Sequence, residues 1–274
     1  MNPRESDKYP PPDSSVTKQG NGGSLAQSLR AYTAARVGLR RAGATLATTE
    51  VLDFKLAHAQ ARDAVHAELD TGEFDARLRQ QITRLSVAAV STVTLKSAAP
   101  DRPAYLRRPD LGRQLDPDSA SQLKALACDV VFVVGDGLSA AAVERHAIPL
   151  LSTVLPETIR KGWTYGPICI ATQARVAIGD AIGAALGAKL SVILIGERPG
   201  LSTPDSLGVY LTWDPRPGRH DAERNCISNV GGAGLSYEIA AARLIWYMSE
   251  AMSRQGTGFA LKEQSSPRLS GPGS

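Results

Sequence analysis

The sequence contains few cysteines and no long apolar run. Its three cysteines, Cys128, Cys169 and Cys226, lie 41 and 57 residues apart, which fits neither a CxxC zinc pattern nor an even disulfide framework. No run approaches the ~18 apolar residues that a membrane span needs, and the first residues lack the apolar core of a secretion signal. We therefore expect a cytoplasmic protein that is neither exported nor embedded in a membrane.

The signatures of a self-contained enzyme are also missing. The sequence has no GxSxG elbow, no GxxxxGK[ST] phosphate loop and no HExxH pair. Its four histidines are too scattered to indicate a metal cluster. With 31 Lys+Arg against 27 Asp+Glu, the net charge of +4 predicts no nucleic-acid partner. We expect neither a catalytic residue nor a metal-ligating residue in this chain.

What is present divides into four segments. Residues 1–23 are rich in proline and glycine and are predicted to be disordered, and residues 263–274 form a predicted flexible tail. Residues 24–122 are predicted to form a mainly helical domain, with one β-like stretch at 87–95. The 43% of apolar residues can supply the core of a globular protein.

One helix of this domain, predicted over residues 52–69, has two distinct faces. Apolar and small residues recur at steps of three and four from Phe54 to Ala64, and basic side chains occupy another face from Lys55 to His66. A solvated cationic face is the simpler interpretation, and a dedicated binding stripe is the alternative.

Residues 123–262 alternate between strand and helix patterns. Strands are predicted at 129–134, 167–171, 190–195 and 209–212, and helices at 138–146, 178–186 and 236–252. Strands alternating with helices of this length favour a parallel sheet built from right-handed crossovers. The fold class is therefore α/β, with a Rossmann-like, mostly parallel sheet domain preceded by the mainly helical domain.

The closing helix carries two apolar stripes. One runs from Tyr237 through Leu244 to Met252, and the other, with Ile239 and Trp246, lies on nearly the opposite side. Either both sides are buried within the domain, or one stripe meets another chain.

A glycine-rich turn follows the first predicted strand of the sheet. Gly135 and Gly137 match the GxGxxA pattern that lets backbone N–H groups approach a phosphate at a helix N-terminus. However, the next strand ends in Gln173 instead of a ribose-binding acid, and Asp136 would repel a pyrophosphate. A structural tight turn is at least as good an interpretation as a nicotinamide site.

A second acidic residue, Glu197, follows the buried-looking strand at 190–195. Ligands of parallel sheets bind beyond the carboxyl ends of the strands, so this position favours a functional carboxylate. A simple salt bridge is the alternative interpretation. Cys226 is more simply read as a small buried residue.

Seven sequence blocks stand out between about residues 25 and 262, at 33–38, 41–43, 52–65, 108–113, 135–139, 196–201 and 226–229. Together and in this order they resemble the light chain of ethanolamine ammonia-lyase. Such a series of blocks is far more specific than a single glycine motif.

The resemblance implies a subunit of an adenosylcobalamin-dependent lyase that converts ethanolamine to acetaldehyde and ammonia by a radical mechanism. The partner would be a large barrel subunit that binds most of the ethanolamine, within a higher-order hetero-oligomer. The cobalamin contacts of the family carry over to Val176, Glu197 and Cys226. Because the sequence has no D-x-H-x-x-G motif, we expect adenosylcobalamin in its base-on form, with its own dimethylbenzimidazole on cobalt.

Two other functions stay open from the sequence. One is an independent nicotinamide-dependent oxidoreductase that uses the turn at 135–137. The other is a non-catalytic assembly subunit that docks through its arginine-rich helices and the Trp246 stripe. Whether residues 1–23 address the chain to a bacterial microcompartment is also open.

Overall fold

The computed structural model describes residues 29, 32–33, 35–86, 90–232 and 234–261. The chain forms two compact units, residues 1–53 and residues 54–274. The predicted disordered segment at 1–23 and the predicted tail at 263–274 lie outside the described residues.

The first unit contains a short antiparallel pair of strands, β1 (Arg41–Ala42) and β2 (Thr45–Leu46). The buried Glu50, in the first turn of α2 (Thr48–His66), forms an ion pair with Arg40 at 3.4 Å. Helix α2 continues into the second unit, and it begins four residues before the predicted helix. The predicted basic face of this helix is exposed to solvent.

The second unit is built on a six-stranded sheet with the order β3-β5-β4-β6-β7-β8. Strands β3, β5, β4 and β6 are parallel, β7 is antiparallel to β6, and β8 is antiparallel to β7. Five of the six strands therefore point the same way, which confirms the predicted α/β fold with a mostly parallel sheet. The strands are β3 (Thr92–Lys96), β4 (Val130–Gly135), β5 (Ile168–Thr172), β6 (Leu190–Gly196), β7 (Leu207–Trp213) and β8 (Arg224–Val230).

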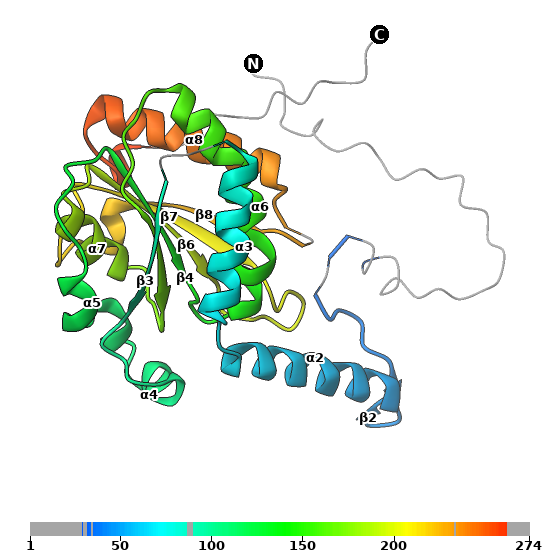
Figure 1. Cartoon of the computed structure of the whole chain (residues 1–274). Helices are drawn as coiled ribbons and strands as arrows, with labels where there is room; N and C mark the ends of the chain where they lie inside the picture. Colours follow the sequence, from blue (N-terminus) through cyan, green and yellow to red (C-terminus); the bar gives the residue numbers. More distant parts are fainter. Residues whose placement is uncertain (1–28, 30–31, 34, 87–89, 233, 262–274) are drawn as a thin grey trace, which may run out of the picture. The chain divides into compact units, whose positions relative to one another are not determined.

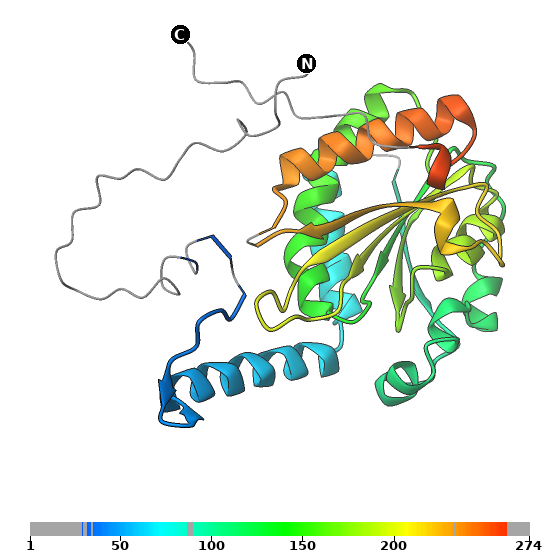
Figure 2. The same ribbon diagram turned by 180° about the vertical axis from the view of Figure 1, so that it is seen from behind.

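Helices cover both faces of this sheet (Figures 1 and 2). Helices α3, α6 and α8 pack on one face, with α3 beside α6 and against β3 and β5, and α7 packs on the other face. No helix among the described residues is long and apolar enough to cross a membrane. The helices are α3 (Thr71–Arg84), α4 (Arg102–Arg107), α5 (Pro117–Ser121), α6 (Ala140–Arg160), α7 (Ile178–Leu186) and α8 (Tyr237–Arg254), with 3₁₀ turns η1 (Leu111–Arg113), η2 (Asp221–Glu223) and η3 (Gly258–Ala260).

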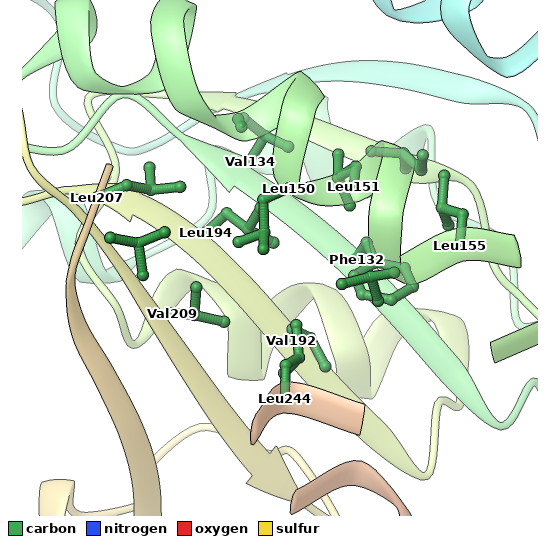
Figure 3. Close-up of a cluster of buried hydrophobic side chains, with 14 of the residues drawn as sticks. Phe132, Val134, Leu150, Leu151, Leu155, Val192, Leu194, Leu207, Val209 and Leu244 are labelled. Carbon is green, nitrogen blue, oxygen red and sulfur yellow. The ribbon is translucent and has the colours of Figure 1, made fainter. Parts of the chain in front are cut away.

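The larger core lies between the sheet and helices α6 and α8. Figure 3 shows Phe132 of β4 and Val192 of β6 packed with Leu155 of α6 and Leu244 of α8. Every residue of β4 and β6 is buried. Strands covered on both faces read as continuous apolar runs, which is why the sequence predicted these two so well.

The structure differs from the sequence prediction in three elements. Helix α6 continues beyond the predicted end at residue 146, through Pro149 and Pro156, because its later turns still bury an apolar face in the core. Strand β8 was not predicted at all. Strand β3 overlaps the predicted β-like stretch, whose residues 87–89 lie outside the described part.

The division of the chain also falls elsewhere than predicted. We expected a boundary near residue 122, whereas the compact units meet between Asp53 and Phe54. The physical reason is that β3 hydrogen-bonds to β5 as the edge of the sheet, and α3 contributes Phe74 and Leu78 to the larger core. Residues 54–122 therefore fold with the sheet.

The two apolar stripes of α8 differ in how deeply they are buried. Leu244 and Met248 of the first stripe are fully buried in the larger core. Ile239 of the second stripe is 48% exposed, and Trp246 is half-buried. Trp246 packs partly against the larger core, but Ile239 stays uncovered by the described residues, so the alternative in which the second stripe meets another chain stays open.

Candidate functional site at the carboxyl edge of the sheet

The loops that follow β4, β5 and β6 lie at the same edge of the sheet, because these strands are parallel. The loop after β4 leads to α6 on one face, and the loop after β5 leads to α7 on the opposite face. Neighbouring strands whose connections leave in opposite directions form a topological switch point, the usual ligand site of an open α/β sheet. Any ligand crevice should lie here.

The crevice between β4 and β5 is occupied by the protein itself. The buried Asp136 accepts hydrogen bonds from the backbone N–H groups of Gln173 and Ala174, both at 2.9 Å, and Nη1 of Arg102 lies 3.5 Å from its carboxylate. The same Nη1 donates to the carbonyl of Gly137 at 2.8 Å. Burial raises the pKa of Asp136, and the N–H groups of Ala174 and Gln173 oppose that rise. This carboxylate acts as a structural bridge between two loops.

The glycine turn at residues 135–137, like the crevice between β4 and β5, has no room for a phosphate. Gly137 has φ +59°, and a Cβ there would lie 2.2 Å from the carbonyl oxygen of Gly196. Its neighbour Leu138 donates its N–H to that same carbonyl at 3.0 Å. Gly137 thus allows close contact between the turn after β4 and the end of β6, which favours the tight-turn interpretation over the nicotinamide one.

Glu197 lies in a different environment, in the β6–β7 hairpin. Its N–H donates to the carbonyl of Ser206 at 3.0 Å, which closes the hairpin. Because β7 and β8 are antiparallel, β8 returns to the same edge and brings Asn229 to Glu197. The N–H of Asn229 lies 3.3 and 3.2 Å from the two carboxylate oxygens. The half-buried Glu197 keeps acceptor capacity beyond these weak contacts.

Cys226 lies exposed on β8, near enough to Glu197 for that carboxylate to affect its pKa. It is opposite Tyr210 in the strand register, and the Tyr210 hydroxyl hydrogen-bonds to its sulfur. Burial raises the pKa of the Cys226 thiol, the Tyr210 hydrogen bond lowers it, and the Glu197 carboxylate raises it, with a net rise. The thiol is therefore protonated at neutral pH, which makes it a poor nucleophile.

A buried ion pair joins β8 to α7. Nη1 and Nη2 of Arg224 donate to the two oxygens of Asp180 at 2.7 and 2.6 Å, the bidentate geometry of a strong pair. Val176 precedes Asp180 by one turn, and Cys226 follows Arg224 by two residues on the same face of the strand. Because α7 runs away from the carboxyl edge and β8 runs toward it, both Val176 and Cys226 lie on the edge side of this pair.

All three predicted cofactor contacts therefore lie on the α7 face of the sheet, toward its carboxyl edge. Cys226 and Glu197 both lie near Tyr210, since each raises the pKa of the Tyr210 hydroxyl. Val176 is half-buried against the smaller core.

The sequence analysis did not identify Tyr210 or the Asp180–Arg224 pair as part of the site. The alternation of side chains along strand β7 was the one sequence signal that could have indicated Tyr210. No group of three or more His, Cys, Asp or Glu within the described ranges is placed to hold a metal ion.

The fold and this edge define an α/β protein of the doubly wound class, with a polar site on its α7 face. The family model of the ethanolamine ammonia-lyase light chain (EutC) matches residues 24–262. The chain belongs to this family, and it is thus a subunit of a lyase.

Curated relatives agree with this assignment. The ethanolamine ammonia-lyase small subunit of Pseudomonas syringae pv. tomato is 50% identical over 242 residues, which cover 86% of this chain and 82% of that protein. The small subunit of Bradyrhizobium diazoefficiens is 51% identical over 244 residues, covering 88% and 91%. That of Azotobacter vinelandii is 49% identical over 255 residues, covering 90% and 92%.

Proposed function

We propose that this chain binds and encloses adenosylcobalamin together with a large barrel subunit, in a complex that deaminates ethanolamine to acetaldehyde and ammonia. The observation that carries the proposal is the convergence of Val176, Glu197 and Cys226 on one face at the carboxyl edge of the sheet. Membership of the light-chain family supports the reaction and the existence of a larger partner.

The residues present fit a corrin. Cobalamin is broad and edged with amide side chains, which need acceptors for their N–H groups. Glu197 offers a carboxylate on a hairpin whose backbone is closed by the Ser206 hydrogen bond, and charge-assisted hydrogen bonds to amides are strong. Val176 offers an apolar contact, and the neutral thiol of Cys226 is a weak donor and acceptor. None of these groups needs to transfer a proton.

Adenosylcobalamin held by Val176, Glu197 and Cys226 would supply radical chemistry for the deamination of ethanolamine. A carbon radical is quenched by stray donors and by solvent, so the site has to be closed and rigid. The task of this chain is to hold the cofactor from one side and to exclude water there. The Asp180–Arg224 pair keeps α7 and β8 together beneath that surface.

The finer points of the assembly belong to the same proposal. The partner would bind most of the ethanolamine, and the two chains would form a higher-order hetero-oligomer in the cytoplasm, with a bacterial microcompartment as the alternative location. We expect the cofactor to bind base-on. A protein imidazole nitrogen found on cobalt by pulsed electron spin resonance of ¹⁵N-labelled holoenzyme would rule out that binding mode.

The direct test is the affinity of the assembled complex for adenosylcobalamin. Glu197→Gln removes the carboxylate charge and retains the shape, and we expect about 10- to 100-fold weaker binding, since a charge-assisted hydrogen bond contributes about 1.5–3 kcal/mol. Glu157→Gln, at a half-buried position of α6 whose carboxylate pairs with Arg160, is the matched control and should bind normally. Unchanged affinity in Glu197→Gln would remove this residue from the site.

The oxidoreductase alternative has its own test. Fluorescence titration of the purified chain with NADH should show no saturable binding, because Asp136 and the Gly137–Gly196 contact fill the turn that a pyrophosphate would need.

A further inference from the structure

Arg102 and Arg175 meet on one tyrosine ring beside the proposed cobalamin surface, and the charges of Arg113 and Arg198 act on Arg175. Arg102 opens α4, Arg113 ends η1, and Arg175 and Arg198 belong to the loops after β5 and β6. The pKa of Arg175 is lowered by burial and, against an opposing effect of Tyr105, by the charges of the other three arginines. Like charges held together in a partly buried place destabilise each other unless an anion joins them.

The centre of this arginine cluster is rigid. The guanidinium carbons of Arg102 and Arg175 lie over the ring of Tyr105, 4.8 and 4.3 Å from its centroid. The Tyr105 hydroxyl donates to the carbonyl of Ala174 at 2.9 Å, and the N–H of Arg175 donates to the carbonyl of Gly112 at 2.7 Å. A Cβ on Gly112 would lie 2.9 Å from Cγ of Arg175. The orientation of Arg175 is therefore fixed within the fold, which lowers the entropy cost of binding a ligand.

Two hydrogen-bond donors of the arginine cluster have no acceptor within the described residues. Among the described residues, Nε of Arg175 and Nη2 of Arg102 are buried without a hydrogen-bond partner. An unsatisfied buried donor costs about 1–3 kcal/mol, more when it is charged. In the same part of the chain, no carboxylate forms an ion pair with Arg113, Arg175 or Arg198.

The nearby carboxylates already have partners. Asp136 is bound to two backbone N–H groups and to Arg102, and Asp110 forms a two-point pair with Arg108 at 2.9 and 2.7 Å. The protein therefore supplies its cluster with less negative charge than it has guanidinium groups. The missing partner is an anion from outside this chain's described residues.

The position of the cluster indicates which anion. Arg175 directly precedes Val176 and Arg198 directly follows Glu197, so the cluster borders two of the three proposed corrin contacts. Planar guanidinium groups match the oxygens of a phosphate group. A base-on cobalamin carries one phosphodiester, in the loop that links the corrin to dimethylbenzimidazole.

We propose that the arginine cluster around Arg175 is the binding site for the phosphodiester of the cobalamin nucleotide loop. This inference rests on the proposed function, because it requires cobalamin on this face. Arg175 is the residue in direct contact, and Arg102 is a positioning residue that is tied to Gly137 and to the Val65 carbonyl. Arg113 and Arg198, both exposed, complete the positive rim.

The test compares two corrinoids in the complex with the large subunit. Cobinamide retains the corrin and its amides but lacks the phosphodiester and the base, so it separates this site from the corrin contacts. By visible absorption titration, Arg175→Gln should weaken the binding of adenosylcobalamin about 10- to 100-fold, from the ~1.5–3 kcal/mol of a charge-assisted hydrogen bond. The affinity for dicyanocobinamide should change less than about twofold.

Two further variants guard against a folding defect. Arg198→Gln, at an exposed side chain, should show a smaller loss of the same selectivity. Arg108→Gln removes an equal charge from the same segment, but its partner is Asp110, so it should bind both corrinoids normally. Equal losses for both corrinoids in Arg175→Gln and Arg198→Gln would overturn the proposal and leave cobalamin binding itself intact.

Other outcomes are equally decisive. If the unaltered complex binds neither corrinoid, the proposed function fails first. If calorimetric titration with inorganic phosphate shows binding that Arg175→Gln abolishes while cobalamin affinity is unchanged, the site serves a free phosphate and the inference is wrong. Competition by phosphate against cobalamin but not against cobinamide would support it.

Discussion

Two carboxylates at the same edge of the sheet have opposite roles. Asp136, after β4, is 1% exposed, and hydrogen bonds from the protein occupy its oxygens. Glu197, after β6, is half-buried and is approached by one weakly placed N–H among the described residues. Both follow a glycine at the end of a buried strand. The position of an acidic residue after a strand therefore does not tell a structural carboxylate from a ligand-binding one. The difference is whether donors of the protein itself already bind the carboxylate oxygens.

The largest effect should come from breaking the structural carboxylate. Asp136→Ala leaves the buried Arg102 without its charge partner and frees two backbone N–H groups, which predicts a loss of about 3–5 kcal/mol in the free energy of unfolding. Urea denaturation of the chain measures it. Glu197→Ala, the matched change at the same edge, should cost under about 1 kcal/mol. Equal losses at the two positions would refute the contrast between them.

The contact between the two loops gives the next effect. Gly137→Ala places a Cβ against the carbonyl of Gly196 at positive φ, so strain and overpacking together should cost about 2–4 kcal/mol. Gly162→Ala has a similar φ of +74° but open space around it, and about 1 kcal/mol is expected from strain alone. If both variants unfold at the same urea concentration, the close approach is not what requires glycine at 137.

The smallest effect concerns the open carboxylate and its neighbours. The raised pKa of Cys226 predicts slow alkylation by iodoacetamide at pH 7, with a rate that rises only as pH passes above the usual thiol range. Glu197→Gln removes a charge that raises this pKa, so alkylation should be faster. Tyr210→Phe removes a hydrogen bond that lowers it, so alkylation should be slower.

Mass spectrometry after a timed reaction distinguishes Cys226 from the buried Cys128 and Cys169. Changes of the same sign in both variants would show that access, and not charge, controls the thiol.

The sequence analysis correctly predicted the helices and strands that a pattern within a short stretch of residues indicates. The fully buried strands β4 and β6 read as apolar runs, and α7 begins and ends at the predicted residues 178 and 186. Strand β8 was missed because its polar residues are satisfied by distant partners: Arg224 by Asp180 of α7, and Asn225 by the carbonyls of Gly258 and Leu261. A strand held together in this way has no apolar alternation of its own.

The candidate site also contains some residues that a local sequence pattern indicates and others that it does not. Glu197 was a candidate from its place after a buried strand, whereas Val176 and Cys226 came from the family resemblance. The role of Asp136 could be guessed only in part, since its repulsion of a phosphate was foreseen but its bonds to Gln173 and Ala174 were not. Those bonds join residues 37 and 38 positions apart, and no local pattern encodes them. The Arg102–Tyr105–Arg175 arrangement is equally non-local.

The buried Asp136 also says something about how this subunit is made. In many doubly wound proteins the turn after the first strand receives its negative charge from a bound nucleotide, so that the empty protein is less stable than the occupied one. Here the counter-charge is encoded in the chain and is present from the moment the sheet folds. The turn after β4 can therefore form completely before any ligand arrives, because the bonds that close it all come from this chain.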